Sequence, residues 1–155
     1  CPRILEGRWA AQRPGRNRMV QIDVVYEGGL HTHCLHGPSQ AEVATDAPRD
    51  NHGRGESFSP TDLATTALAS CMLTVMGIKA QEHDWKIDGM RASCEKHMTA
   101  DPVRRIGRIV VRFSLASDLS REATKVLERT ARTCPVAMSL NPDIELDVHF
   151  DWEAA

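Results

Sequence analysis

The segment from Leu63 to about Gln81 constrains the fold of this chain more than any other part of the sequence. It follows Ser59-Pro60, a favourable helix start because serine caps the first amide groups and proline suits the first turn. Asp62 then lies near the positive end of the helix dipole. Apolar side chains run nearly all the way round this helix, and its polar ones are small and uncharged. Such a helix is buried on most faces, which in so short a chain needs a sheet on one side and a partner on the other. The pattern therefore predicts dimerisation.

Alternating apolar and polar residues predict strands on both sides of this helix. Before it, Gly28-Gly29 and Gly37-Pro38 separate three short runs, and after it the alternation returns three times. A second helix begins at the Ser120 cap and ends before Pro135. The strands are predicted over residues 20–26, 30–36, 41–45, 90–98, 109–115 and 144–152. The order βββ-α-ββ-α-β, with antiparallel strands and segregated helices, indicates an α+β fold.

Length, composition and charge exclude several classes of protein. With 155 residues, 41% of them hydrophobic, the chain can form one globular domain and bury roughly two-thirds of its unfolded surface without disulfides. No run approaches the roughly 18 apolar residues that a membrane-spanning helix needs. A net charge of −2 gives no basic footprint for nucleic acid. We therefore expect neither a membrane nor nucleic acid as a partner.

Residues 1–18 differ from the rest of the chain in charge and pattern. They carry five arginines against one glutamate, show no periodicity and are followed by Met19. We interpret residues 1–18 as a basic leader that is non-native or disordered, and residues 19–155 as the folded domain.

The five cysteines form no CxxC pair and have no zinc-ligand spacing, which indicates free thiols in the cytoplasm. Cys94 follows the apolar phase of its strand, so we expect an inert core thiol there. Cys34 lies within the run His31-Thr32-His33-Cys34-Leu35-His36. Because side chains alternate along a strand, at most two of these four metal-binding groups can converge. A metal-binding protein remains one functional hypothesis.

Cys71 and Cys134 occupy different positions. Cys71 lies in the middle of the first helix, and Cys134 closes the apolar face of the second helix just before Pro135. Both are therefore expected to point toward the same interior. These facts alone are compatible with two interpretations: two buried thiols that only pack in the core, or a reactive pair.

Two motifs resemble those of a known family. The run Ser57-Phe58-Ser59-Pro60-Thr61-Asp62-Leu63, followed by Cys71 in Leu68-Ala69-Ser70-Cys71, is similar to the central-helix signature of the OsmC/Ohr family. These are the osmotically inducible and organic hydroperoxide resistance proteins. The Cys134-Pro135-Val136 run resembles the second mark of that family. The resemblance covers about residues 20–152 and excludes the leader.

The resemblance implies an OsmC-like fold, in which an antiparallel sheet wraps around a long buried central helix in an intertwined homodimer. It also implies a cytoplasmic thiol peroxidase of the oxidative stress response, without a cofactor. Cys71 would attack an organic hydroperoxide and become a sulfenic acid. Cys134 would resolve it as a Cys71–Cys134 disulfide, and an external dithiol would reduce both.

The resemblance also raises the question of how Cys71 is activated. Family peroxidases use an arginine from the N-terminal strands, where this chain has Leu30-His31-Thr32-His33 without an arginine. They also use a glutamate at the opening of the helix, where this chain has Thr61. Candidate substitutes for the cation are Arg49, Arg54 and His33, and either Glu56 or Asp62 could orient such a group. Both departures resemble the broader OsmC-like branch. The alternative hypothesis is a non-peroxidatic protein that binds a small apolar ligand in the dimer-interface cavity.

Overall fold

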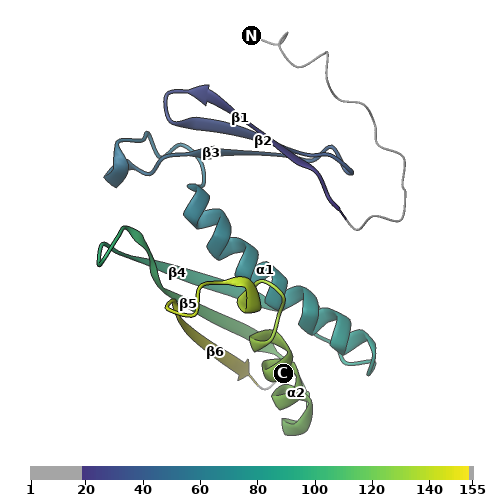
Figure 1. The fold of residues 1–155 in the computed structure, drawn as a ribbon. Helices are drawn as coiled ribbons and strands as arrows, with labels where there is room; N and C mark the ends of the chain where they lie inside the picture. Colours follow the sequence, from purple (N-terminus) through teal and green to yellow (C-terminus); the bar gives the residue numbers. More distant parts are fainter. Residues whose placement is uncertain (1–18, 154–155) are drawn as a thin grey trace. The chain divides into compact units, whose positions relative to one another are not determined.

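The computed structural model describes residues 19–153, so the proposed leader lies outside the described residues. The chain forms two compact units that meet between Ser59 and Pro60. The ribbon in Figure 1 labels the elements of both units. Residues 19–59 are called unit 1, and residues 60–153 are called unit 2.

Unit 1 is the predicted antiparallel meander. It contains β1 (Ile22–Gly28), β2 (His31–His36) and β3 (Glu42–Asp46) in the order β1-β2-β3, followed by the short 3-10 helix η1 (Arg49–Asn51). The first turn has positive φ angles at Gly28, Gly29 and Leu30. The two glycines adopt this conformation without steric cost, which explains the break in the alternating pattern at this point.

One face of the unit 1 sheet is apolar and exposed. Ile22 and Tyr26 of β1 are 61% and 63% exposed, and Val24 lies between them in the same phase. The register places Val24 opposite Cys34, and Cys34 opposite Val43. Among the described residues, every buried hydrophobic side chain belongs to unit 2. Unit 1 therefore presents an apolar sheet face without a core of its own, and an exposed patch of this kind marks an interaction surface.

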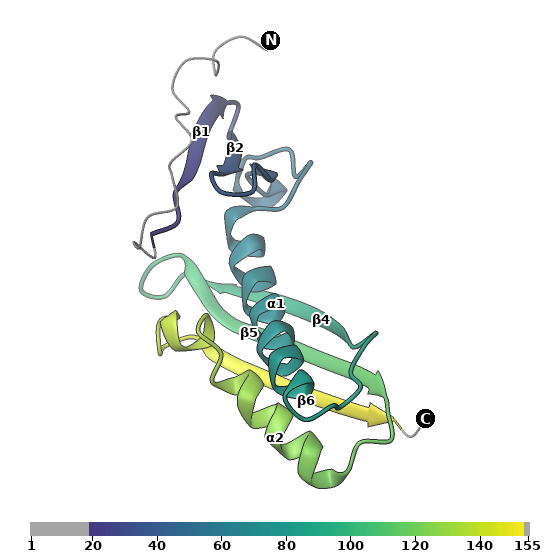
Figure 2. The ribbon, with the colours of Figure 1, turned by 90° about the vertical axis from the view of Figure 1, so that its right-hand side faces the viewer.

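Unit 2 is a three-stranded sheet with two helices on one face, as Figure 2 shows. Helix α1 (Pro60–Gln81) packs against helix α2 (Arg121–Arg132) and β4. The strands are β4 (Arg91–Thr99), β5 (Arg105–Ala116) and β6 (Glu145–Glu153), in the order β4-β5-β6, with the 3-10 helix η2 (Ala137–Ser139) before β6.

The pairing of the last strand corrects the expectation of antiparallel strands throughout. β4 and β5 are antiparallel, but β5 and β6 are parallel. Helix α2 connects them, and a helix is the usual crossover that returns the chain to the same end of a sheet. The alternation of β6 is the same for both orientations, so the sequence pattern could not distinguish them.

The core of unit 2 lies between the helices and the inner face of the sheet. Leu68, Met72 and Met76 of α1 are completely buried, as are Leu127 and Ala131 of α2. The inner face of β5 contributes Ile109, Val111 and Phe113. The predicted Ser120 cap is confirmed, because its hydroxyl accepts a hydrogen bond from the amide of Ala123 at 3.2 Å.

Within one chain, α1 is buried on one side only, not nearly all round as its composition suggested. Its exposed side consists mainly of small residues: Thr66, Ala67, Ser70, Thr74 and Ile78. Its most apolar 18-residue window has a mean hydropathy of 1.5, so α1 is long and apolar enough to cross a membrane. The expectation that no segment approaches this composition is therefore wrong. We assign α1 as a core helix because its buried side carries the core of unit 2.

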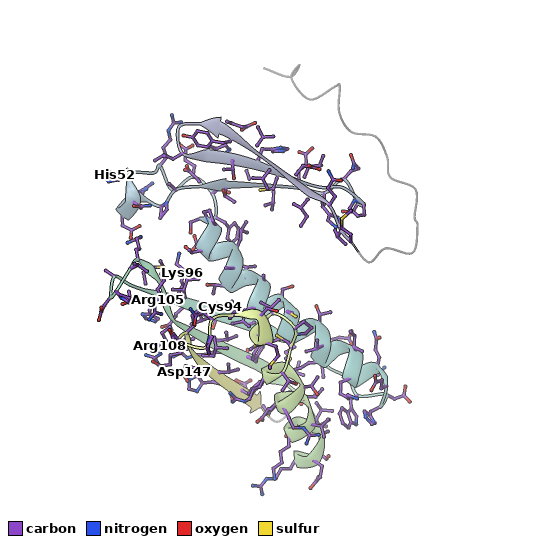
Figure 3. The ribbon with its side chains drawn as sticks, in the orientation of Figure 1. His52, Cys94, Lys96, Arg105, Arg108 and Asp147 are labelled. Carbon is purple, nitrogen blue, oxygen red and sulfur yellow. The ribbon has the colours of Figure 1, made fainter. Side chains whose placement is uncertain are left out.

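The outer face of the unit 2 sheet carries a network of charged side chains. Arg112 of β5 binds Glu95 of β4, and Glu95 also contacts His97 at 3.3 Å. Arg108 of β5 binds Asp147 of β6, and the two residues lie side by side in Figure 3. The hydrogen bond from Arg112 lowers the pKa of Glu95, and the hydrogen bond from Arg108 lowers the pKa of Asp147.

These lowered pKa values predict acid sensitivity. A carboxyl whose pKa is lower in the folded chain stabilises the fold above its unfolded pKa and loses that contribution as the pH falls toward the folded pKa. We expect the melting temperature to fall between about pH 5 and pH 3. Asp147→Asn should lower the melting temperature at pH 7 and reduce the fall in acid, whereas Asp118→Asn, at an exposed loop position, should melt like the wild type throughout. Identical melting profiles for wild type and Asp147→Asn would contradict this.

Candidate functional site

Cys71 and Cys134 belong to one packed core although they come from different elements. Cys71 is half-buried in the middle of α1, and Cys134, two residues beyond the end of α2, is 1% exposed. The interaction with Cys71 raises the pKa of the Cys134 thiol. Cys134 belongs to the buried core of unit 2, and Cys71 packs against that core. The expectation that both point toward the same interior is confirmed.

A rigid turn holds the Cys134 sulfur. The amide of Ala137 donates a hydrogen bond to Cys134 Sγ at 3.3 Å. The amide of Met138 donates to the carbonyl oxygen of Cys134 at 3.0 Å. Pro135 suits the turn between Cys134 and Ala137 because proline has no amide hydrogen that would need an acceptor. Cys134 therefore acts on η2 much as a capping residue acts on a helix.

The pKa of Cys134 is raised from its ordinary value. Burial is the main cause, and the interaction with Cys71 adds to it, while the amides of Ala137 and Val136 act in the opposite direction. At neutral pH, Cys134 is therefore a protonated thiol. Since a thiolate is the nucleophile in cysteine chemistry, this pattern favours Cys71 as the attacking sulfur of the pair.

Asp62 forms an ion pair that the sequence analysis missed. Lys96 Nζ of β4 donates to Asp62 Oδ1 at 2.6 Å and to Thr61 Oγ1 at 2.8 Å. Figure 3 labels Lys96 on the same strand as Cys94. The sequence signal for this ion pair was Lys96 itself, a charged residue on the strand face that otherwise carries Ala92, Cys94 and Met98. Asp62 precedes Cys71 by nine residues, about 13 Å along the helix, so this pair is not beside Cys71 in the same chain.

Arg49, Arg54 and Glu56 belong to unit 1, whereas the two cysteines belong to unit 2. Arg49 Nε donates to the carbonyl oxygen of Arg54 at 3.1 Å, and Arg54 pairs with Glu56 at 4.0 Å. The loop that carries them is tightly built. A Cβ at Gly53 would lie 1.7 Å from the carbonyl oxygen of Ala47, a contact that no L side chain can make. The loop thus holds two exposed guanidinium groups on a defined backbone.

The loop is also attached to β3 by a buried carboxylate. Asp46 is 2% exposed and accepts a hydrogen bond from the amide of Glu56 at 2.9 Å. The same aspartate donates its own amide to the carbonyl oxygen of Phe58. Asp46 therefore fixes the chain on both sides of the loop that presents Arg49 and Arg54.

The expectation for Cys94 is wrong, because this thiol is exposed. Its strand phase was assigned correctly, since Lys96 on the same face reaches α1. However, β4 is an edge strand of the unit 2 sheet, and the layer above an edge strand is incompletely covered. The face of the strand on which Cys94 lies therefore did not determine whether its thiol is buried.

The histidines of β2 each have a separate partner. His33 lies 3.3 Å from Glu42, and His31 lies 3.8 Å from Glu27. His36 is hydrogen-bonded to Ser39 at 2.6 Å. Across residues 19–153, no group of three or more histidine, cysteine or carboxylate side chains is arranged to hold a metal ion.

Comparison with known proteins identifies the family. The family model described as OsmC-like protein matches residues 53–149, which include both cysteines of the site. The chain belongs to the OsmC-like family. A sequence comparison with curated proteins returns no match.

Solved structures of OsmC proteins share the fold. The chain is 45% identical to an osmotic stress induced and detoxification response protein from Psychrobacter arcticus, with a TM-score of 0.81, over 86% of this chain and 97% of that one. An organic hydroperoxide resistance protein OsmC from Legionella pneumophila is 15% identical, with a TM-score of 0.70 over 86% and 96%. One from Elizabethkingia anophelis is 12% identical, with the same TM-score and coverage. The last two similarities show the OsmC-like fold alone.

Proposed function

We propose that this OsmC-like protein is a thiol peroxidase that reduces organic hydroperoxides, with Cys71 as the attacking and Cys134 as the resolving residue. The observation that carries the proposal is that Cys71 packs against the buried cluster that contains Cys134, where the interaction with Cys71 raises the pKa of Cys134. Two proteins of the same fold are named organic hydroperoxide resistance proteins, which supports the choice of substrate.

The reaction would proceed in two balanced steps. The Cys71 thiolate attacks the terminal oxygen of the hydroperoxide, a sulfur–oxygen bond forms, the oxygen–oxygen bond breaks, and the alkoxide leaves and takes up a proton to become an alcohol. The thiol of Cys134 then attacks the Cys71 sulfenic acid, so that a disulfide forms and water leaves. An external dithiol would reduce the disulfide by thiol–disulfide exchange.

We also propose that the working protein is a homodimer and that residues 19–155 are its OsmC-like domain. Two exposed surfaces support this: the apolar face of β1 to β3 and the small-residue side of α1. Close packing of helices favours small side chains, and an apolar sheet face needs a cover. All four cysteines between residues 19 and 153 are free thiols, which supports a reducing, cytoplasmic location.

A disulfide-mapping experiment tests the proposed chemistry. The reduced protein is mixed with one equivalent of cumene hydroperoxide, quenched with an alkylating agent and analysed by mass spectrometry. We expect a rapid Cys71–Cys134 disulfide, with Cys34 and Cys94 recovered as alkylated thiols. In Cys134→Ser, a sulfenic acid should accumulate on Cys71 and be trapped by dimedone. Thiols that stay unreacted after prolonged exposure would contradict the proposal and favour binding of a small apolar ligand instead.

A further inference from the structure

We infer that the exposed face of helix α2 is a docking surface for an acidic protein that carries the dithiol which reduces the Cys71–Cys134 disulfide. The inference rests on the proposed function, because this disulfide is a product of the proposed peroxidase cycle. It adds the place where the reducing partner binds and the charge that the partner presents there. The docking surface, called the basic stripe, consists of Arg121, Lys125, Arg129 and Arg132.

The four cations share one face of α2 because residues three or four positions apart lie above one another on a helix. All four are exposed, whereas the opposite side of α2 belongs to the buried core of unit 2. From Arg121 to Arg132 the basic stripe extends about 16 Å along the helix. Arg132 lies two residues before Cys134, so the basic stripe ends at the proposed resolving residue.

The carboxylate nearest in the sequence does not neutralise the basic stripe. Within residues 19–153, the side chains of Arg121, Lys125 and Arg129 form no ion pair. Glu122 lies three residues before Lys125 and is exposed without binding it. By contrast, both arginines in the network on the outer face of the sheet bind carboxylates. The basic stripe is therefore an unneutralised positive surface.

Glu128 and Arg132 have the spacing of a favourable helix ion pair but bind other groups. Glutamate four residues before arginine is the stabilising order, yet Glu128 Oε1 accepts a hydrogen bond from Trp152 Nε1 at 2.9 Å. Arg132 Nη2 donates to the carbonyl oxygen of Val148 at 2.8 Å, and its guanidinium lies 5.5 Å from the centre of the Phe150 ring. Strand β6 therefore fixes Arg132 and holds Glu128 away from it.

Helix stability does not account for the basic stripe. Like charges four residues apart repel each other, and a positive charge in the first turn opposes the helix dipole. Arg129 and Arg132 suit the last turn of α2, but Arg121 is its first residue and Lys125 follows four residues later. Because Arg121 and Lys125 destabilise the isolated helix, we attribute their position to the binding of an anionic surface.

The place of the basic stripe favours a protein that reduces the disulfide over other anions. The stripe ends at Cys134, where a nucleic acid would have no part in the chemistry. A net charge of −2 and the exposed Glu122 beside the stripe also disfavour a long polyanion. A protein with a carboxylate-rich surface near its dithiol complements the cations and brings the reductant to the disulfide.

The reduction proceeds in two balanced steps once the partner is docked. Its first thiolate attacks the sulfur of Cys71, the half-buried member of the pair, and the bond between Cys71 and Cys134 breaks. The partner's second thiol then displaces Cys71 from the mixed disulfide. The partner leaves as a disulfide, and its two protons end on Cys71 and Cys134, so that both are thiols again.

Reduction by charged dithiol peptides tests the inference. The Cys71–Cys134 disulfide is formed with diamide, and its reduction is followed by mass spectrometry. Two synthetic dithiol peptides differ only in carrying glutamates or glutamines around the same cysteine pair. At an ionic strength of about 0.01 M, where the screening length is about 30 Å, Lys125→Gln/Arg129→Gln should slow reduction by the glutamate peptide about tenfold. Reduction by the glutamine peptide and by dithiothreitol should not change.

The matched control is Lys86→Gln/Arg91→Gln, which removes the same charge from two exposed residues outside α2. Both peptides should reduce this variant as fast as the wild type. At an ionic strength of about 1 M, where the screening length is about 3 Å, the glutamate peptide should reduce all three proteins at the same rate.

Three outcomes would overturn the inference. One is an equal loss of rate in both double variants, which would reflect net charge alone. Another is unchanged reduction of Lys125→Gln/Arg129→Gln by the glutamate peptide. The third is binding of a short DNA duplex, or association beyond a dimer, that this variant loses and the control keeps. Because diamide forms the disulfide, the result does not depend on hydroperoxide reduction, which the disulfide-mapping experiment tests separately.

Discussion

Replacing Cys71 by serine is expected to abolish the proposed hydroperoxide reduction, with a loss of about three orders of magnitude or more in kcat/KM. Cys71 is the half-buried member of the thiol pair, whereas its partner is buried and protonated. A serine hydroxyl has nearly the same size but is not ionised at neutral pH, so it cannot attack the oxygen–oxygen bond. The measurement is consumption of cumene hydroperoxide with dithiothreitol as the reducing dithiol.

The matched control is Cys94→Ser. It makes the same substitution at an exposed thiol of β4, and wild-type turnover is expected. Turnover by Cys71→Ser at more than a few per cent of the wild type would assign the chemistry to another group. Equal losses in both variants would indicate a general loss of structure, which circular dichroism would reveal.

Introducing arginine at Ser70 is expected to convert the proposed homodimer to monomers. Ser70 lies on the exposed small-residue side of α1, and arginine is a good helix former, so an isolated chain should tolerate the change. In a dimer that packs this side of α1 against a second copy, the arginine would be a buried charge without a partner. Such a charge costs about 3–5 kcal/mol, which weakens association by about two to four orders of magnitude.

Light scattering at micromolar concentration measures the outcome. Wild type should have twice the mass of the chain, and Ser70→Arg should have the mass of one chain. Gln81→Arg, at the exposed last residue of the same helix, is the control and should remain dimeric. A dimeric Ser70→Arg would place the interface away from this side of α1, and a monomeric wild type would refute the proposed homodimer.

Local patterns predicted most of the elements. The start of α1 at Pro60, the Ser120 cap and the three-stranded meander of unit 1 all follow from residues that are neighbours in the sequence. Backbone geometry sets the periods of helices and strands, so a short window of sequence contains the necessary information. The resemblance to the OsmC/Ohr family, carried by two short motifs, is confirmed by the family match.

The errors concern relations between distant segments. Parallel pairing of β5 and β6 depends on how α2 returns the chain. Exposure of Cys94 depends on the position of β4 at the edge of its sheet. Lys96 was overlooked because its partners, Thr61 and Asp62, are more than thirty residues away. Only Lys96 leaves a sign in its own strand, a charge in an otherwise apolar phase, and that sign does not identify its partners.

The sequence by itself determined that a long apolar helix with small polar residues forms the centre of this protein, and that it carries Cys71. It also determined that Cys134 ends the apolar face of a second helix. Only the tertiary structure decided that the two thiols share one packed core, that Cys134 is the buried one with a raised pKa, and that one side of α1 stays exposed in the single chain. The physical reason is that helix and strand periods come from local backbone geometry, whereas a contact, a burial or a raised pKa comes from the packing of segments far apart in the chain.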